Sequence, residues 1–153
     1  MIKSSELQLW NVYGSGYIQK KMVSNTLENI FPNLTGVQNR DQTVLTYVLA
    51  WWNTHPSLAL TSARIYFRTY AAGGTNLAIA LDTTGPAPAN GVIWNFSNPP
   101  ATYITPTTVG TGLSVPTLNP GYAVAFWIRR TATASAPLRP ERNTITITGT
   151  SAA

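Results

Sequence analysis

Residues able to carry acid–base or nucleophilic chemistry are scarce in this chain. It has one histidine, no cysteine and five carboxylates among 153 residues: Glu6, Glu28, Asp41, Asp82 and Glu141. Glycosidase chemistry would need two carboxylates facing each other across a sugar, for example Asp41 with Asp82. Asp41 follows Arg40 in a predicted loop, however, and Asp82 precedes Thr-Thr-Gly, which is typical of a turn. We therefore interpret both as turn residues.

The histidine and the glycine-containing motifs give no stronger catalytic signal. His55 directly precedes Pro56, and no Gly-x-Ser-x-Gly elbow supplies a serine for a triad. Without cysteine there are no thiolate ligands, and a metal site needs several converging groups. The Gly14-Ser15-Gly16 and Gly110-Thr111-Gly112 segments do not continue into the Gly-Lys-Ser/Thr of a phosphate loop. The sequence predicts a protein that is not an enzyme and holds neither cofactor nor metal.

Charge is low and unevenly distributed. Lys and Arg total 10 against 5 Asp and Glu, which gives a net charge of +5 with only 10% charged residues. Soluble domains average about 25%. The basic residues are scattered, so we expect no dedicated nucleic-acid binding. The first ten residues contain Lys3 and Glu6 and no apolar run, and the chain has no apolar window of about 18 residues. We therefore expect cytosolic synthesis without a secretory signal and no contact with a membrane.

The hydrophobic pattern favours strands over helices. The stretch 83–128 has no charged residue and seven prolines, which excludes substantial helix. Period-2 alternation predicts strands at 63–70, 76–82, 122–129 and 143–149. Weaker strands are expected at 43–52, 91–96, 101–105 and 112–115. Turn signals separate them, among them Gly73-Gly74, Asn90-Gly91 and Asn119-Pro120-Gly121.

Short strands separated by turns every 8–12 residues are typical of a β-sandwich. We therefore predict an all-β fold consisting of a single immunoglobulin-like β-sandwich at 41–153. Residues 1–40 show little clean alternation, and we expect them to form an N-terminal arm with one or two edge strands.

Aromatic and arginine side chains share strand faces in two places. Tyr66 alternates in phase with Arg64 and Arg68, and Trp127 is in phase with Arg129. Aromatic residues with Arg are typical of protein–protein hot spots. The candidate partner interface consists of Arg64, Tyr66, Arg68, Trp127, Arg129 and Arg130.

The aromatic residues also admit two other interpretations. Most large side chains of a small sandwich fill its core. Trp51 and Trp52 are adjacent, however, so on a strand they cannot both point inward. An exposed member of this pair could stack on a sugar ring, which makes Trp51 and Trp52 the alternative, carbohydrate-binding candidates.

The C-terminal third resembles a known class of protein. The segment 118–131 reads Leu-Asn-Pro-Gly-Tyr-Ala-Val-Ala-Phe-Trp-Ile-Arg-Arg-Thr, and after an Ala/Pro-containing loop the segment 143–150 reads Asn-Thr-Ile-Thr-Ile-Thr-Gly-Thr. A turn, a strand ending in Trp-(Ile/Val)-Arg-Arg-Thr, a loop and a final strand closing with small residues are similar to the C-terminal end of small β-sandwich structural proteins of tailed bacteriophages. The strands at 62–70 and 77–82 also fit, so the resemblance covers about 43–153. Residues 1–40 do not match.

The resemblance implies a virion component without enzymatic activity. A capsid decoration (cement) protein is the first expectation, binding the major capsid protein through the N-terminal arm and the aromatic/Arg strand faces, with several copies in the assembly. A tail-associated structural protein bound to tail proteins is the second. A carbohydrate- or receptor-binding module that uses Trp51 or Trp52 remains the alternative from another class.

Overall fold

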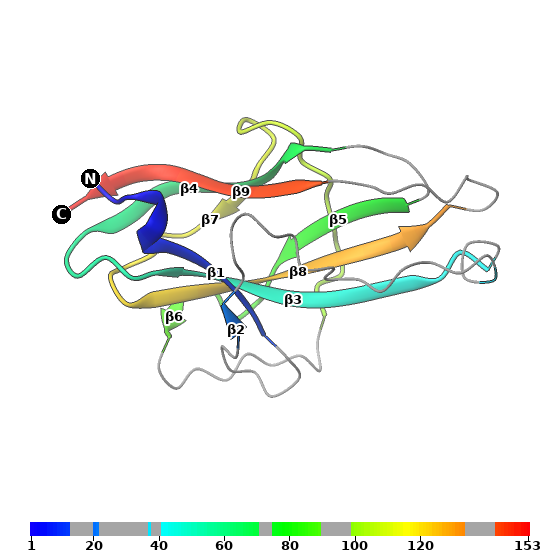
Figure 1. The fold of residues 1–153 in the computed structure, drawn as a ribbon, viewed down its shortest axis with the longest axis horizontal. Coiled ribbons are helices and arrows are strands. Elements are labelled where there is room, and N and C mark those ends of the chain that lie inside the picture. Colours follow the sequence, from blue (N-terminus) through cyan, green and yellow to red (C-terminus); the bar gives the residue numbers. More distant parts are fainter. Residues whose placement is uncertain (13–19, 22–36, 38–40, 71–74, 90–98, 134–142) are drawn as a thin grey trace.

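The computed structural model describes residues 1–12, 20–21, 37, 41–70, 75–89, 99–133 and 143–153. Within these ranges the chain forms two antiparallel sheets packed face to face (Figure 1). Sheet A has the order β2 (Lys20–Lys21), β1 (Leu7–Asn11), β3 (Val44–Asn53), β8 (Tyr122–Ala132) and β5 (Thr75–Leu81), and β6 (Ala87–Pro88) also pairs with β8. Sheet B has the order β7 (Leu113–Val115), β4 (Ala59–Thr69) and β9 (Thr144–Ala152). The predicted all-β sandwich is confirmed, whereas its immunoglobulin-like character stays a prediction.

One apolar core lies between the sheets. Sheet B contributes Ala63, Ile65 and Phe67 of β4, which are at most 1% exposed, and sheet A contributes the inward side chains of β3, β5 and β8. The alternation in β4 leaves the intervening residues on the opposite, outward face. Burial of one face of each sheet in a common core is what holds the two layers together.

Strand β8 occupies the centre of sheet A. It pairs with β3 along one edge and with β5 along the other. Its residues are almost all buried, in agreement with the apolar character of both of its faces. The strand predicted at 122–129 is therefore observed, and it continues three residues past the predicted end, Arg129.

The proline-containing segment after residue 99 links the two sheets along one side. Its one ladder contact with sheet A is the antiparallel bridge between Ile104 and Ile79. The amide of Phe67 in sheet B donates to the carbonyl oxygen of Pro106 at 2.8 Å. The strand predicted at 101–105 is thus wrong, and the structure has an isolated bridge there. Pro100 and Pro106, which lack an amide donor, flank this stretch and limit the length of any ladder, and the bridge at Ile104 covers part of the free edge of β5.

Sheet B contains a β-bulge. The β4–β9 register shifts between Thr61 and Arg64, and Ser62 has a left-handed φ of +51°. Gly149 of β9 lies beside this point: a Cβ atom there would be 2.8 Å from the carbonyl oxygen of Thr61 and 2.9 Å from Leu60. Only glycine therefore permits so close an approach of the two strands.

Residues 1–12 are part of the sandwich. A short 3₁₀ turn, η1 (Ser4–Glu6), leads into β1, which pairs with β3 from Leu7 to Asn11. The amide of Ile2 donates to the hydroxyl of Ser151 at 2.8 Å, so both chain ends lie together at one end of the molecule (Figure 1). Of the one or two edge strands expected within 1–40, β2 lies at the edge of sheet A, and β1 lies between β2 and β3. Residues 1–12 do not form a free arm, because they are held by the sheet ladder and by core contacts of Ile2, Leu7 and Leu9.

Some predicted features lie outside the described residues. These are the Gly73-Gly74 and Asn90-Gly91 turns, the strand at 91–96 and most of 13–40.

Candidate functional site

The outward face of sheet B carries one of the two predicted aromatic/Arg sets. Arg64 and Tyr66 of β4 are partly exposed and Arg68 is exposed, whereas the intervening residues of this strand are buried. In β9, Thr148 lies opposite Arg64 and Thr146 opposite Tyr66. We call this surface the Arg/Thr face; it consists of Arg64, Tyr66, Arg68, Thr144, Thr146 and Thr148.

The backbone beneath the Arg/Thr face is held on both sides. Arg64 pairs with Ser114 of β7 as well as with β9, and its Nη1 donates to the carbonyl oxygen of Gly112 at 3.1 Å. Strands β4, β7 and β9 contain no Asp or Glu. Two guanidinium groups, a phenol and a row of hydroxyls therefore form a cationic, hydrogen-bonding surface on a paired sheet, suited to an acidic partner.

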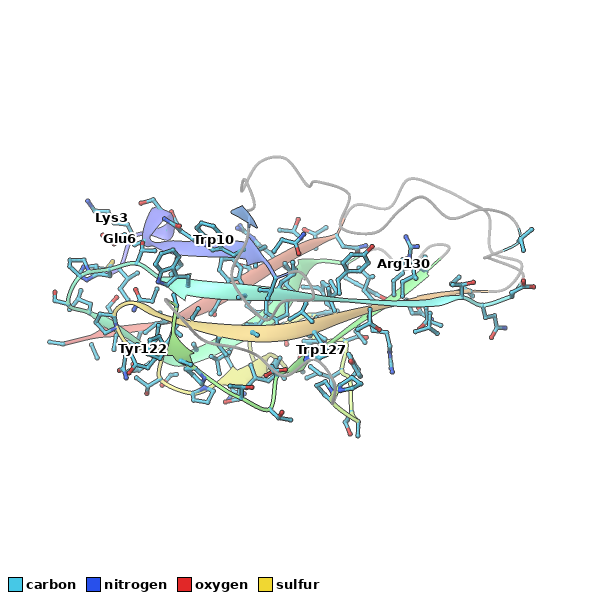
Figure 2. All side chains as sticks on the ribbon, turned by 90° about the horizontal axis from the view of Figure 1, so that it is seen from below. Lys3, Glu6, Trp10, Tyr122, Trp127 and Arg130 are labelled. Carbon is cyan, nitrogen blue, oxygen red and sulfur yellow. The ribbon has the colours of Figure 1, made fainter. Side chains whose placement is uncertain are left out.

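The second predicted set consists of Trp127, Arg129 and Arg130 on β8. Two of these residues, Trp127 and Arg130, are buried. Trp127 is only 6% exposed on the outward face of sheet A, and its Nε1 donates to Oδ1 of Asp82 at 2.8 Å. Around it, Val48, Ala50 and Ala125 are buried as well. Trp127 is therefore corrected from a contact residue to a structural one: its own chain covers it. Figure 2 shows Trp127 on β8 and Trp10 on β1, the two strands that flank β3.

Arg130 also needs correction. It lies on the other face of β8, level with Leu45 of β3 and Leu77 of β5, and is 7% exposed. Alternation along β8 places it in phase with the core residue Ile128. Because the strand continues to Ala132, this arginine points inward and cannot contribute contact area to a partner.

Arg129 keeps partial exposure. Its guanidinium carbon lies 4.1 Å from the ring centroid of Tyr103, a cation–π contact. Burial raises the pKa of the Tyr103 phenol above its ordinary value of 10.0, and the nearby positive charge of Arg129 partly opposes this rise. Tyr103 thus packs over the outward face of sheet A and helps to cover Trp127.

The two adjacent tryptophans point to opposite faces of β3. Trp51 packs against the core, whereas Trp52 packs on the outward face with its ring centroid 5.5 Å from that of Trp10, at an interplanar angle of 54°. Both are partly buried, and neither indole Nε1 has a hydrogen-bond partner among the described residues. Trp51 is therefore corrected from a sugar-stacking candidate to a core residue, and Trp52 presents an edge of a tilted pair rather than a flat platform.

The groups considered for catalysis have structural partners and lie apart. Asp82 is 2% exposed and also accepts from the amide of Thr84 at 3.0 Å. Asp41 precedes β3 near Thr131 of β8, whereas the amide of Asp82 donates to the carbonyl oxygen of Ala125. These two positions are about 20 Å apart along β8, so the two carboxylates do not face each other. The ring Nδ1 of His55 accepts from the amides of Ser57 and Leu58 at 3.1 and 2.9 Å, which stabilises a turn.

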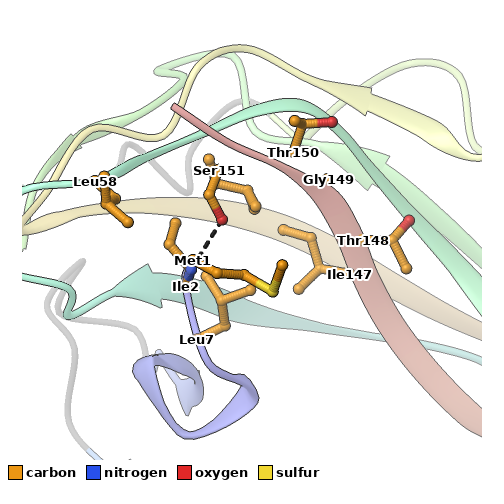
Figure 3. Close-up of a pocket in the computed structure, with 10 residues that line it drawn as sticks. Met1, Ile2, Leu7, Leu58, Ile147, Thr148, Gly149, Thr150 and Ser151 are labelled. Atoms are coloured by element: carbon orange, nitrogen blue, oxygen red, sulfur yellow. Dashed lines mark hydrogen bonds between the residues drawn. The ribbon is translucent and has the colours of Figure 1, made fainter. Parts of the chain in front are cut away.

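A cleft that the sequence analysis missed opens between the N-terminal segment and β9 (Figure 3). Its volume is about 620 Å³, and its lining side chains are uncharged: Met1, Ile2, Leu7, Leu58, Leu60, Ile147, Thr148, Thr150 and Ser151, together with Gly149. They come from three separate parts of the chain. No local pattern marks such a site, because only the sandwich brings these residues together.

Comparison of the chain with protein-family models, curated protein sequences and solved structures finds no match. Among the described residues, no group of three or more His, Cys, Asp or Glu side chains could hold a metal ion. No helix in the same part of the chain is both long and apolar enough to cross a membrane.

Proposed function

We propose that this protein is a non-enzymatic structural component of a tailed-bacteriophage particle, a capsid decoration protein that docks through the Arg/Thr face. Two lines of support are combined. The segments 118–131 and 143–150 resemble the closing strands of small virion β-sandwich proteins, and the Arg/Thr face offers a surface on which such a protein can dock. The immunoglobulin-like strand arrangement predicted from the strand and turn pattern also belongs to this proposal.

The exposure of Arg64, Tyr66 and Arg68 on a paired sheet is the observation that carries the proposal. Interface hot spots are enriched in Tyr and Arg, and a rigid backbone lowers the entropy lost on docking. With no carboxylate in the three strands, the face attracts an acidic surface, so opposite charge on the shell exterior would accelerate docking. Residue Arg129 adds a partly exposed cation elsewhere, on the outward face of sheet A.

Binding to particles that lack the protein tests the docking face. The variant Arg64→Gln/Arg68→Gln should lose at least about 30-fold in affinity, since a hot-spot arginine contributes about 2 kcal/mol or more. The control Lys3→Gln removes an exposed charge outside the proposed face and should change affinity less than about threefold. Equal loss in both variants would mean diffuse charge attraction and would contradict the proposed face.

The number of copies per particle distinguishes a capsid decoration protein from a tail protein. Quantitative mass spectrometry of purified particles should find this chain in numbers comparable to the major capsid protein. A small number of copies would replace decoration by the tail-associated role. Glycan binding by the purified protein that is abolished by Trp52→Ala would contradict the structural role and support a carbohydrate-binding module.

A further inference from the structure

Strand β9 forms an edge of sheet B with an unusual composition. It is nine residues long and pairs with β4, and no other strand in the described part of the chain pairs with its second edge. Natural edge strands are shielded by charges, prolines, bulges or a covering segment. The edge of β5 is shielded by the Ile104 bridge, whereas residues 143–153 contain no Lys, Arg, Asp, Glu or Pro.

The cleft beside β9 borders the apolar core. Leu60 and Ile147, which belong to the core cluster, form part of its wall. Met1 stands at its mouth and is 97% exposed, so it does not fill the cleft (Figure 3). An unpaired edge and a cleft with a largely apolar lining therefore occur at the same place.

We propose that two copies of this chain associate through β9, paired antiparallel across a two-fold axis. The strand is self-complementary: Thr144, Thr146 and Thr148 lie on the outward face, and Ile145 and Ile147 lie inward. Antiparallel two-fold pairing sets threonines against threonines and isoleucines against isoleucines. The two copies of sheet B become one six-stranded sheet, and the inward isoleucines close both clefts.

The net charge of +5 does not oppose this association at the contact itself. The nearest strand cations are Arg64 and Arg68 on β4, and β4 of one copy would lie three strand spacings, about 14 Å, from β4 of the other. The Debye length at physiological ionic strength is about 8 Å, so their repulsion is largely screened. This inference goes beyond the proposed function and uses the edge of sheet B, while the Arg/Thr faces of both copies remain exposed on the same side.

The absence of cysteine makes a crosslinking test direct. Among the single variants Thr144→Cys, Thr146→Cys and Thr148→Cys, the one on the two-fold axis should form disulfide-linked dimers under mild oxidation, because only a residue on the axis lies directly opposite its own copy and within disulfide range. The position closest to the two-fold axis should react fastest. Ser114→Cys on β7, at the other edge of sheet B, is the matched control and should remain uncrosslinked. Equal or faster crosslinking of Ser114→Cys would overturn the proposal.

Sedimentation velocity across a concentration series gives an independent measure. The unmodified protein should approach twice its chain mass of 16.6 kDa. The variant Thr146→Lys places like charges at the pairing edge and should raise the dissociation constant at least about tenfold. Thr117→Lys, an exposed site outside β9, should not change it. The proposal would be overturned if the protein stayed monomeric throughout the concentration series. It would also be overturned if Thr146→Lys dimerised as tightly as the native protein while its circular dichroism spectrum was unchanged. Particle binding by the Arg/Thr face is measured separately, so the two proposals can fail independently.

Discussion

The two outward faces of the sandwich differ in what covers them. The outward face of sheet A is built from small and aromatic residues around Trp127, and Tyr103 and Ala89 pack over it. The outward face of sheet B is built from Arg, Tyr and Thr, and these side chains are partly or fully exposed. An antiparallel sheet with one wet face shows apolar/polar alternation, whereas a sheet buried on both faces is apolar throughout. The first face therefore serves stability, and the second is available for binding.

The sharpest test of this difference is removal of Trp127. Trp127→Ala should lower the free energy of unfolding by about 3–5 kcal/mol, because it opens a cavity and leaves the buried Asp82 carboxylate without its indole donor. Urea denaturation measures this directly. Trp127→Phe keeps most of the apolar volume and should cost about 1–3 kcal/mol. On the Arg/Thr face, Arg68→Ala should change stability by less than about 0.5 kcal/mol. Similar costs for Trp127→Ala and Arg68→Ala would break the distinction between the faces.

The bulge in sheet B gives the next largest effect. Gly149→Ala should lower the free energy of unfolding by about 1–3 kcal/mol, since the added Cβ would press on the carbonyl oxygen of Thr61 and on Leu60. Gly110→Ala is the matched control: the added Cβ would lie 3.9 Å from the hydroxyl oxygen of Thr108, and the backbone of Gly110 has no left-handed φ. We expect it to be nearly neutral in the same denaturation experiment. A neutral Gly149→Ala would show that β4 and β9 separate there at little cost.

The cation–π contact between Arg129 and Tyr103 lies on the outward face of sheet A, and its contribution to stability can be measured. Arg129→Gln removes the cation above the Tyr103 ring and should lower the free energy of unfolding by about 0.5–1 kcal/mol. In a double-mutant cycle with Tyr103→Leu, the coupling between the two residues should have about this size. A coupling of zero would mean that Tyr103 covers Trp127 without help from Arg129.

The smallest effect is expected in alkaline solution. The pKa of Tyr103 is raised mainly by burial, so the folded protein retains the phenol proton at a pH where the unfolded chain has begun to lose it. Its contribution to the free energy of unfolding is therefore constant below about pH 10 and falls as the pH rises from there through the folded-state pKa. Thermal unfolding at pH about 9 and about 11 should show a larger loss for the native protein than for Tyr103→Phe. An identical loss in both would place the ionised phenol in solvent and remove Tyr103 from the cover.

Local alternation was sufficient to predict most of the fold. The strands around Ile65, Leu77, Phe126 and Ile147 were expected within a few residues of their observed bounds, because side chains on a strand point alternately to its two faces. The same rule would also have placed Arg130 inward had the strand been extended beyond Arg129. The bridge at Ile104 was not predictable as such, since a proline-flanked segment shows no ladder pattern.

The candidate surfaces were predicted only in part. Arg64, Tyr66 and Arg68 were placed together correctly, because they lie on one face of one strand. Trp127 satisfied the same local criterion and is nevertheless buried, since Tyr103 and Ala89 pack on the face to which it belongs. The cleft beside β9 was missed because Ile2, Leu58 and Ile147 are far apart in the sequence.

The amino-acid sequence by itself determined the strands, their two faces and the near absence of charge from the middle of the chain. These properties follow from residue type and from a period of two along an extended backbone. Only the tertiary structure decided which outward face is covered, which of Trp51 and Trp52 enters the core, and that the edge of β9 borders an open cleft. Exposure depends on which distant segments pack against a side chain, and that is a property of the assembled sheets rather than of any one strand.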